Sequence, residues 1–318
     1  MNQRGVTPVV EGVLLAVGSV VLGLMAVYMP ILGMAALLLW SVPIAVLTVR
    51  QGIGKGVMAS IMAGILMALM IEPVLAFRLV LACAPVGLAL GSFIRKGWSG
   101  ARVFMGSFCV SFLAQVIVVG LLFFIMNVNA MEVQLSILRE SFDQSFAMYE
   151  TLGVPQEQID EDRGNIGPTL ELVSMLMPLI LILMAALDTV ACYFMTGRIL
   201  RRIGMKAPEL PRFSQWRLPT FFLYLLGFAL VGMYWGGTRE IPILYEASLN
   251  VNLVAMFAGA IQGISLLWYA AERFHVPGFM RWLLLLIIML NIIFLQIVAF
   301  TGLFDMIFDY RKRFGTTK

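Results

Sequence analysis

Long apolar segments separated by short polar ones dominate the chain. A helix that spans a bilayer needs about 20 apolar residues, and nine segments approach or reach that length. They run at roughly 9–29, 31–49, 53–71, 74–94, 104–126, 170–195, 218–235, 249–271 and 281–303. The pattern predicts an all-α polytopic transmembrane helical bundle with eight or nine spans. The weakest is 218–235, which is short and interrupted by glycines.

Two prolines shape the first pair of segments. Pro30 alone separates them, so we expect a tight antiparallel hairpin. Pro43 removes a backbone donor and clashes with the preceding turn, which predicts a kink in the second segment.

Small residues recur at every fourth position in the third segment. They are Gly52, Gly56, Ser60, Gly64 and Ala68. This spacing places them on one helical stripe, and in lipid such stripes let helix backbones approach closely. We therefore interpret this segment as the central packing helix, although glycine and alanine are also common in membrane helices generally. The eighth segment repeats the pattern at Ala255, Gly259 and Gly263.

The long loop at 127–168 is acidic and carries one apolar face. Its apolar residues recur at steps of three and four, at Met131, Leu135, Leu138, Phe142, Phe146 and Tyr149. This periodicity predicts an amphipathic helix of about five turns, ending at Gly153 with Pro155 beyond it. The helix is either a lid over a substrate cavity or an interfacial helix on the membrane surface.

The positive charges indicate an orientation. Lys and Arg gather in the loops on one side of the predicted spans, which is typical of cytoplasmic loops, and this places the N-terminus in the cytoplasm. The acidic loop then lies outside. Nine spans would also put the C-terminus outside, against the preference of its basic tail, which contains Arg311, Lys312, Arg313 and Lys318. Either the tail is an exception or one segment does not span.

Composition excludes several classes of protein. The 318 residues are 61% hydrophobic and 13% charged, with a mean hydropathy of +0.94, whereas a soluble domain is about one quarter charged. The net charge of +4 comes from residues between apolar segments, which signal topology and not nucleic-acid binding. Cys83, Cys109 and Cys192 show no CxxC spacing, and His275 is the single histidine. We expect no metal site, no cofactor, no catalytic triad and no enzyme activity.

Ionisable residues at membrane depth are the candidate functional residues, because they are costly there. Asp188, in the sixth segment, is the strongest; it either couples to a proton or ligand or makes a structural hydrogen bond to a hydroxyl or to Arg198. Glu72, Arg78 and Glu171 lie near the outer ends of their segments. They form either a site for a small polar solute or a salt bridge between helix ends. Amides such as Gln115 and Gln262 are more typical of contacts between helices.

Four stretches carry a resemblance to a known family. Residues 7–32, 41–66, 83–97 and 303–315 read TPVVEGVLLAVGSVVLGLMAVYMPIL, SVPIAVLTVRQGIGKGVMASIMAGIL, CAPVGLALGSFIRKG and LFDMIFDYRKRFG. They resemble the YybS family of bacterial membrane proteins, whose function is unknown. The first six helices are also similar to the substrate-binding S-components of energy-coupling-factor vitamin transporters. Those proteins dock a coupling protein through small residues on the first helix; here Gly12 and Ala16, or Ser19 and Gly23, have that spacing.

Two functions follow as hypotheses. In the first, residues 1–200 form a six-helix S-component-like module that binds or moves a small solute with a partner, and residues 201–318 add membrane segments and the basic tail. In the alternative, the chain is a membrane scaffold or regulator that contacts other membrane proteins, or itself, through its small-residue faces. Both place it in the bilayer of a bacterial plasma membrane, with no nucleic acid as a partner.

Overall fold

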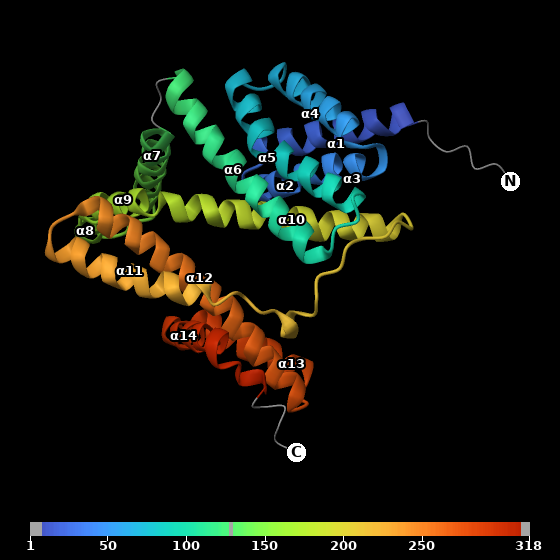
Figure 1. Ribbon diagram of the computed structural model, residues 1–318. Helices are drawn as coiled ribbons and strands as arrows, with labels where there is room; N and C mark the ends of the chain where they lie inside the picture. Colours follow the sequence, from blue (N-terminus) through green and yellow to red (C-terminus); the bar gives the residue numbers. More distant parts are fainter. Residues whose placement is uncertain (1–7, 127–129, 313–318) are drawn as a thin grey trace. The chain divides into compact units, whose positions relative to one another are not determined.

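The computed structural model describes residues 8–126 and 130–312, and the regular secondary structure among them is helical (Figure 1). This confirms the predicted all-α polytopic fold. The chain forms two compact units, residues 1–210 and residues 211–318, each with its own core. The boundary lies ten residues beyond the predicted one at 200.

Unit 1 begins with two helices in a tight hairpin and continues through eight more. In chain order the helices are α1 Pro8–Tyr28, α2 Pro30–Leu39, α3 Ser41–Gln51, α4 Ile53–Ala68, α5 Pro73–Arg95, α6 Gly100–Met126, α7 Ala130–Thr151, α8 Gln156–Gly164, α9 Ile166–Met175 and α10 Met177–Arg202. One residue separates α1 from α2, as predicted, but it is Met29, and Pro30 is the first residue of α2. The helices pack so closely there that a Cβ added at Gly33 would lie 2.8 Å from the Ala26 carbonyl oxygen.

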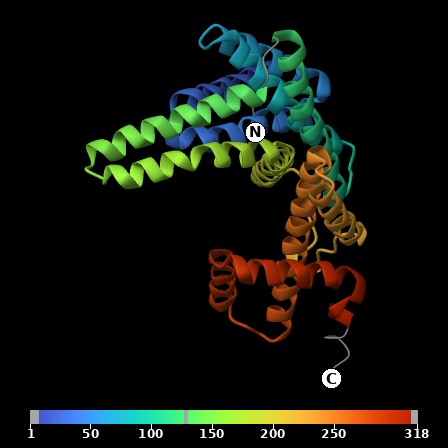
Figure 2. The ribbon, with the colours of Figure 1, turned by 90° about the vertical axis from the view of Figure 1, so that its left-hand side faces the viewer.

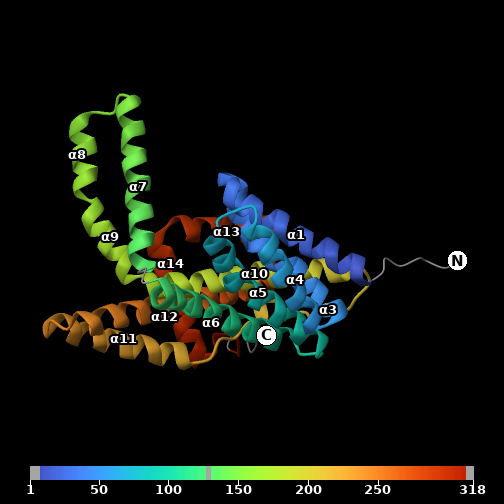
Figure 3. The ribbon, with the colours of Figure 1, turned by 90° about the horizontal axis from the view of Figure 1, so that it is seen from above.

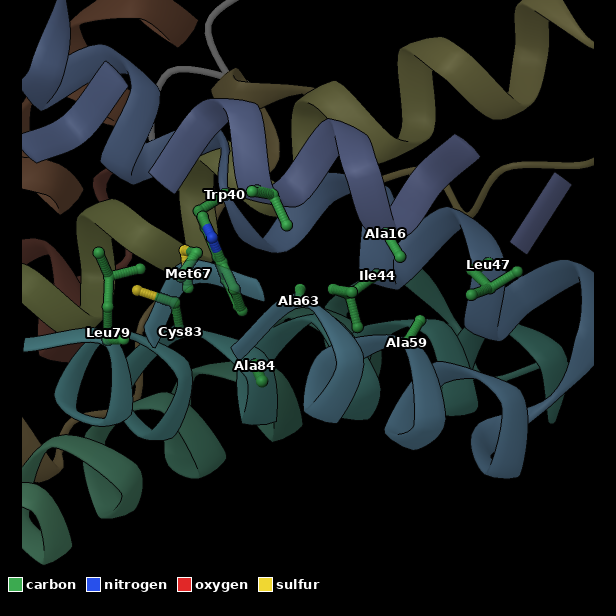
Figure 4. Close-up of a cluster of buried hydrophobic side chains, with 12 residues drawn as sticks. Ala16, Trp40, Ile44, Leu47, Ala59, Ala63, Met67, Leu79, Cys83 and Ala84 are labelled. Carbon is green, nitrogen blue, oxygen red and sulfur yellow. The ribbon is translucent and has the colours of Figure 1, made fainter. Parts of the chain in front are cut away.

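The most buried helix of unit 1 is α3, and not the helix at 53–68 that the sequence indicates. Eight of the eleven residues of α3 are buried, and it packs against α1, α4, α5 and α10. Gly91 permits the close approach of α5 to α3, because a Cβ at this position would lie 2.7 Å from the Ala45 carbonyl oxygen. The break between α2 and α3 falls at Trp40, three residues before Pro43, where the missing amide of the proline distorts the helix. Figure 4 shows Trp40 and Ile44 in the resulting core.

The segment after α6 forms a helical hairpin. The predicted amphipathic helix is confirmed as α7, and Gly153 ends its last turn with a positive φ of 77°. Two further helices that the sequence does not predict as separate elements, α8 and α9, fold back along α7 and project with it from the other helices of unit 1 (Figures 2 and 3). Phe146 of α7 and Ile159 of α8 are buried. The apolar face of α7 is therefore covered in part by the chain itself.

Unit 2 has four helices and a short 3-10 turn among its described residues. They are the turn Phe213–Gln215, α11 Phe221–Thr238, α12 Pro242–Arg273, α13 Gly278–Leu290 and α14 Ile292–Phe308. Helices α11 and α12 lie side by side (Figures 1 and 3), and α14 packs against α12. Leu226, Ala255 and Leu303, one residue from each of these three helices, form the core.

Seven of the described helical segments are long and apolar enough to cross a membrane. Helix α4, with 16 residues, is shorter than that limit. The suspected weak span is intact, because α11 runs unbroken for 18 residues. The break occurs instead in the predicted segment 281–303, where α13 and α14 meet at Asn291 with a bend of 107°. The Asn291 side chain caps α14 by accepting hydrogen bonds from the amides of Ile293 and Phe294. If the bent pair counts as one span, the described residues contain eight.

A buried carboxylate between α6 and α10

Asp188 lies inside unit 1 and is only 8% exposed. Its carboxylate accepts a hydrogen bond of 3.0 Å from the Nε2 amide of Gln115 on α6. The two residues are 73 positions apart in the chain, and the packing of α6 against α10 brings them together. A single amide hydrogen bond does not offset the cost of burying a full negative charge. Asp188 is therefore the ionisable residue of unit 1 that most needs a functional explanation.

Gln115 continues a polar stripe along α6, defined here as Ser107, Ser111 and Gln115. The three residues recur at every fourth position, so they share one face of the helix, and both serines are fully buried. In the part of the chain that the structure describes, neither serine hydroxyl has a hydrogen-bond partner. Buried hydroxyls normally find partners, so the polar stripe has spare hydrogen-bonding capacity beside the Asp188 pair.

No cation neutralises Asp188 within the described residues. Arg198, one of its predicted partners, is exposed, and none of the ion pairs among the described residues includes Asp188. Residues 8–126 and 130–312 also contain no group of three His, Cys, Asp or Glu side chains that could hold a metal ion. The predicted structural hydrogen bond exists, but its donor is an amide and not a hydroxyl or an arginine.

The three outer charges do not form the predicted cluster. Glu72, Arg78 and Glu171 are all exposed, and in the part of the chain that the structure describes no ion pair joins any two of them. Glu72 precedes α5 and Arg78 lies within it, whereas Glu171 lies on α9 in the projecting hairpin. Glu171 lies on α9, before the break at Leu176, and not on the long helix α10.

The small-residue face of α1 is filled by unit 1 itself. Ala16, Ser19 and Gly23 are buried, and a Cβ at Gly23 would lie 3.1 Å from the Trp40 indole nitrogen. Gly12 of the same face lies toward Leu47. This face of α1 therefore packs against α2, α3 and α4 of unit 1, and its role in docking a partner protein stays a prediction.

The stripe at 52–68 also packs inside unit 1, with one exception. Gly56 and Ser60 are buried, and a Cβ at Gly56 would lie 2.7 Å from a methyl group of Leu88. Gly64 lies against Val80 of α5 at 3.0 Å by the same measure, and Ala68 packs against the core. The exception is Gly52, which ends α3 with a φ of 96° instead of joining α4.

Sequence reasoning missed a second buried charge, at one end of unit 2. Asp305 of α14 accepts a hydrogen bond of 2.7 Å from Gln262 of α12 and faces Arg311 at 3.6 Å. Arg311 donates to the Ser214 carbonyl oxygen at 2.6 Å and to the Ser265 hydroxyl at 3.0 Å. Through this buried network, Ser214 at the start of unit 2 and Asp305 near the end of α14 both contact the same part of α12. The sequence feature that could have indicated this buried pair is an aspartate, Asp305, six residues before an arginine, Arg311, at the end of an apolar helix.

The C-terminal residues after α14 add an exposed ion pair that is sensitive to acid. Asp309 pairs with Lys312 at 3.0 Å and with Arg217 at 2.8 Å. The hydrogen bond from Lys312, followed by the charge of Arg217, lowers the pKa of Asp309 below its ordinary value of about 4. Of the tail residues named above, Arg313 and Lys318 lie outside the described residues.

This pair predicts a small loss of stability in acid. A lowered pKa in the folded state means that Asp309 stabilises the fold above its ordinary pKa and loses that contribution as the pH falls below about 4. We expect the melting temperature to fall more between pH 5 and pH 3 in the wild type than in Asp309→Asn. Asparagine tolerates the φ of 44° at this position. Equal slopes in the two proteins would contradict the prediction.

Comparisons with known proteins agree on a membrane family. A family model described as a predicted membrane protein (DUF2232) matches residues 17–306. The chain is similar to the "Uncharacterized protein YybS" of Bacillus subtilis (strain 168), with 22% identity over 312 residues that cover 95% of this chain and 97% of the relative. No solved structure matches, and the likeness to S-components stays a prediction. The family match covers most of the chain, which therefore belongs to the DUF2232 family of predicted membrane proteins.

Proposed function

We propose that this protein is a transporter-like membrane module for a small solute, in which Asp188 is the coupling group. The observation that carries the proposal is the burial of Asp188 against Gln115, with no ion pair to a cationic side chain among the residues that the structure describes. A charge in such a place requires a counter-charge. A proton or a small cation from solution supplies that charge, and its binding and release would couple to solute movement. The proposed role is not enzymatic.

The polar stripe supports the same role. Ser107 and Ser111 provide unpartnered hydroxyl groups on the face of α6 that also carries Gln115. Intramembrane polar side chains that face the interior of a bundle mark ion and solute pathways. The scaffold alternative is weaker, because the small-residue faces of α1 and α4 are already used inside unit 1.

The proposal includes an orientation in a bacterial plasma membrane. In unit 2, Arg217, just before α11, pairs with Asp309, just after α14. With α11 and α12 as two crossings, the start and the end of unit 2 lie on one side of the membrane. The basic residues on that side favour the cytoplasm. The proposal counts the short helix α4 as a crossing beside the five longer candidate spans of unit 1, and it treats the bent pair α13 and α14 as a segment that does not cross. Six crossings in unit 1 and two in unit 2 then place both termini in the cytoplasm and remove the conflict over the basic tail.

A ligand screen with one matched pair of variants tests the proposal. The purified protein is heated with a panel of vitamins, nucleotides and small ions, because a ligand of the folded state raises its melting temperature by mass action. We expect at least one saturable shift, and Asp188→Asn should weaken the apparent affinity for that ligand by about tenfold or more. Asparagine keeps the shape of the side chain. The control is Glu157→Gln, which removes an exposed charge of α8.

Two results would count against the transporter-like role. The first is a panel that gives no shift with the folded wild type. The second is a ligand whose apparent affinity is unchanged in Asp188→Asn, which would separate binding from the buried carboxylate. Uptake of the ligand into proteoliposomes then distinguishes transport from binding alone.

A further inference from the structure

An apolar groove with a single arginine lies on the surface of unit 1. It has a volume of about 290 Å³ and runs between α5 and α6. Phe77 and Leu81 line it from α5, and Val118 and Leu122 line it from α6. Arg78 is the charged member of its lining. Both helices are candidate spans, so the apolar part of the groove opens toward the acyl region of a bilayer.

Arg78 is an exposed cation without a partner among the described residues. Within residues 8–126 and 130–312 its guanidinium group takes part in none of the hydrogen bonds, ion pairs or ring contacts. It lies five residues after α5 begins, or about 7.5 Å along the helix axis. This position is shallow enough for the side chain to reach the headgroup region of a membrane. The cation is therefore available to bind an anion from outside the described protein.

We propose that the groove binds an anionic phospholipid, with the phosphate on Arg78 and one acyl chain along the groove. A guanidinium group matches phosphate with paired hydrogen bonds, and the apolar side chains of both helices suit a hydrocarbon chain. A lipid satisfies both features at once, whereas a soluble phosphate satisfies only the first. This inference does not depend on Asp188 or on the proposed transport role.

Lipid titration of the full-length protein tests the charged half of the site. In a neutral detergent, we expect phosphatidylglycerol to raise the melting temperature at a concentration about tenfold lower than phosphatidylcholine does. Arg78→Gln should abolish this preference. The matched control is Arg198→Gln, which removes another exposed arginine, on α10, and should keep it.

A second pair of variants tests the apolar half. Leu122→Trp places a larger side chain in the groove and should weaken the binding of phosphatidylglycerol, whereas Phe124→Trp, at an 83% exposed position of α6 outside the lining, should not. Soluble glycerol phosphate should give no shift. The proposal is overturned if both phospholipids act alike on the wild type, if Arg78→Gln keeps the preference, or if glycerol phosphate reproduces the shift.

Discussion

Replacing Asp305 by alanine is expected to lower the free energy of unfolding by about 3–5 kcal/mol, the cost of leaving a buried charge without its partner. The side chains of Asp305 and Arg311 are 2% and 4% exposed. Asp305 also accepts hydrogen bonds from Gln262 at 2.7 Å and from the Tyr310 amide at 2.9 Å. The alanine variant therefore removes three interactions and leaves an arginine buried.

Deprotonation of Arg311 does not reduce this loss of stability. Burial lowers its pKa and the nearby Asp305 carboxylate opposes that effect, but an arginine in a protein stays charged at neutral pH. The guanidinium group is also held by the Ser214 carbonyl oxygen and lies over the ring of Tyr269 at 5.7 Å. A buried cation fixed in this way has little freedom to move to water.

A double variant separates the ion pair from the space that it fills. The combination of Asp305→Leu with Arg311→Met removes both charges and keeps much of the volume, and we expect it to recover most of the stability lost in Asp305→Ala. The control is Glu272→Ala, whose partner Arg281 is 3.7 Å away at the surface; it should cost no more than about 1 kcal/mol. Denaturant titration in detergent measures all of these changes. If Asp305→Ala lowers the free energy of unfolding by no more than Glu272→Ala does, the buried network contributes nothing to stability.

The sequence predicted the helices better than their contacts. Apolar length alone located α1, α5 and α6, and the periodicity at 131–149 located α7, because both signals depend on residues close together in the chain. The segment predicted at 170–195 was only partly right, because α9 ends at Met175 and α10 runs from Met177 to Arg202. The α13–α14 break was missed because Asn291 looks like an ordinary polar residue in an apolar segment. Only the structure shows it as the cap of a second helix.

The candidate site was predicted in part for the same reason. An acid in an apolar segment marked Asp188, and an amide marked Gln115, but nothing in either segment specifies that α6 and α10 pack at this register. Ala16, Ser19 and Gly23 show a further limit. A face of small residues indicates close helix packing, yet the same pattern fits a contact within the chain or with a partner, and here the contact is internal.

Asp305 was overlooked because charges near helix ends are common in membrane proteins. The basic residues that follow it fit a topology signal, and that interpretation explains Lys312, which is 78% exposed, but not the buried Arg311. The burial of Arg311 depends on Ser214 and Ser265, 97 and 46 residues earlier in the chain. Contacts at such separations leave no local pattern.

A second large effect is expected at Gly302, where α14 crosses the glycines of α12. A Cβ at this position would overlap the carbonyl oxygen of Gly259 and lie 2.8 Å from the Cα of Gly263. These are backbone atoms, which cannot rotate away as a side chain can. Gly302→Ala should therefore force the helices apart and lower the free energy of unfolding by about 3 kcal/mol, the upper end for an overpacked core.

Gly227→Ala is the matched control for this variant. Gly227 lies within α11 of the same unit and has nothing within 4 Å of an added Cβ. Alanine there should be neutral or stabilise the protein by up to about 1 kcal/mol, because it restricts the unfolded chain and favours helix. Equal losses in the two variants would mean that the approach of α14 to α12 does not explain the requirement for glycine.

The two sites in unit 2 should not act independently. Gly302 lies one turn before Asp305, and the contact that brings Gly302 onto α12 also brings Asp305 to Gln262. If Gly302→Ala displaces α14, the Asp305 carboxylate has already lost part of its network, so Asp305→Ala should cost less in that background than in the wild type. Neighbouring sites that share partners typically couple by about 0.5–3 kcal/mol. Strict additivity in a double-variant cycle would show that the glycine crossing and the buried ion pair stabilise unit 2 separately.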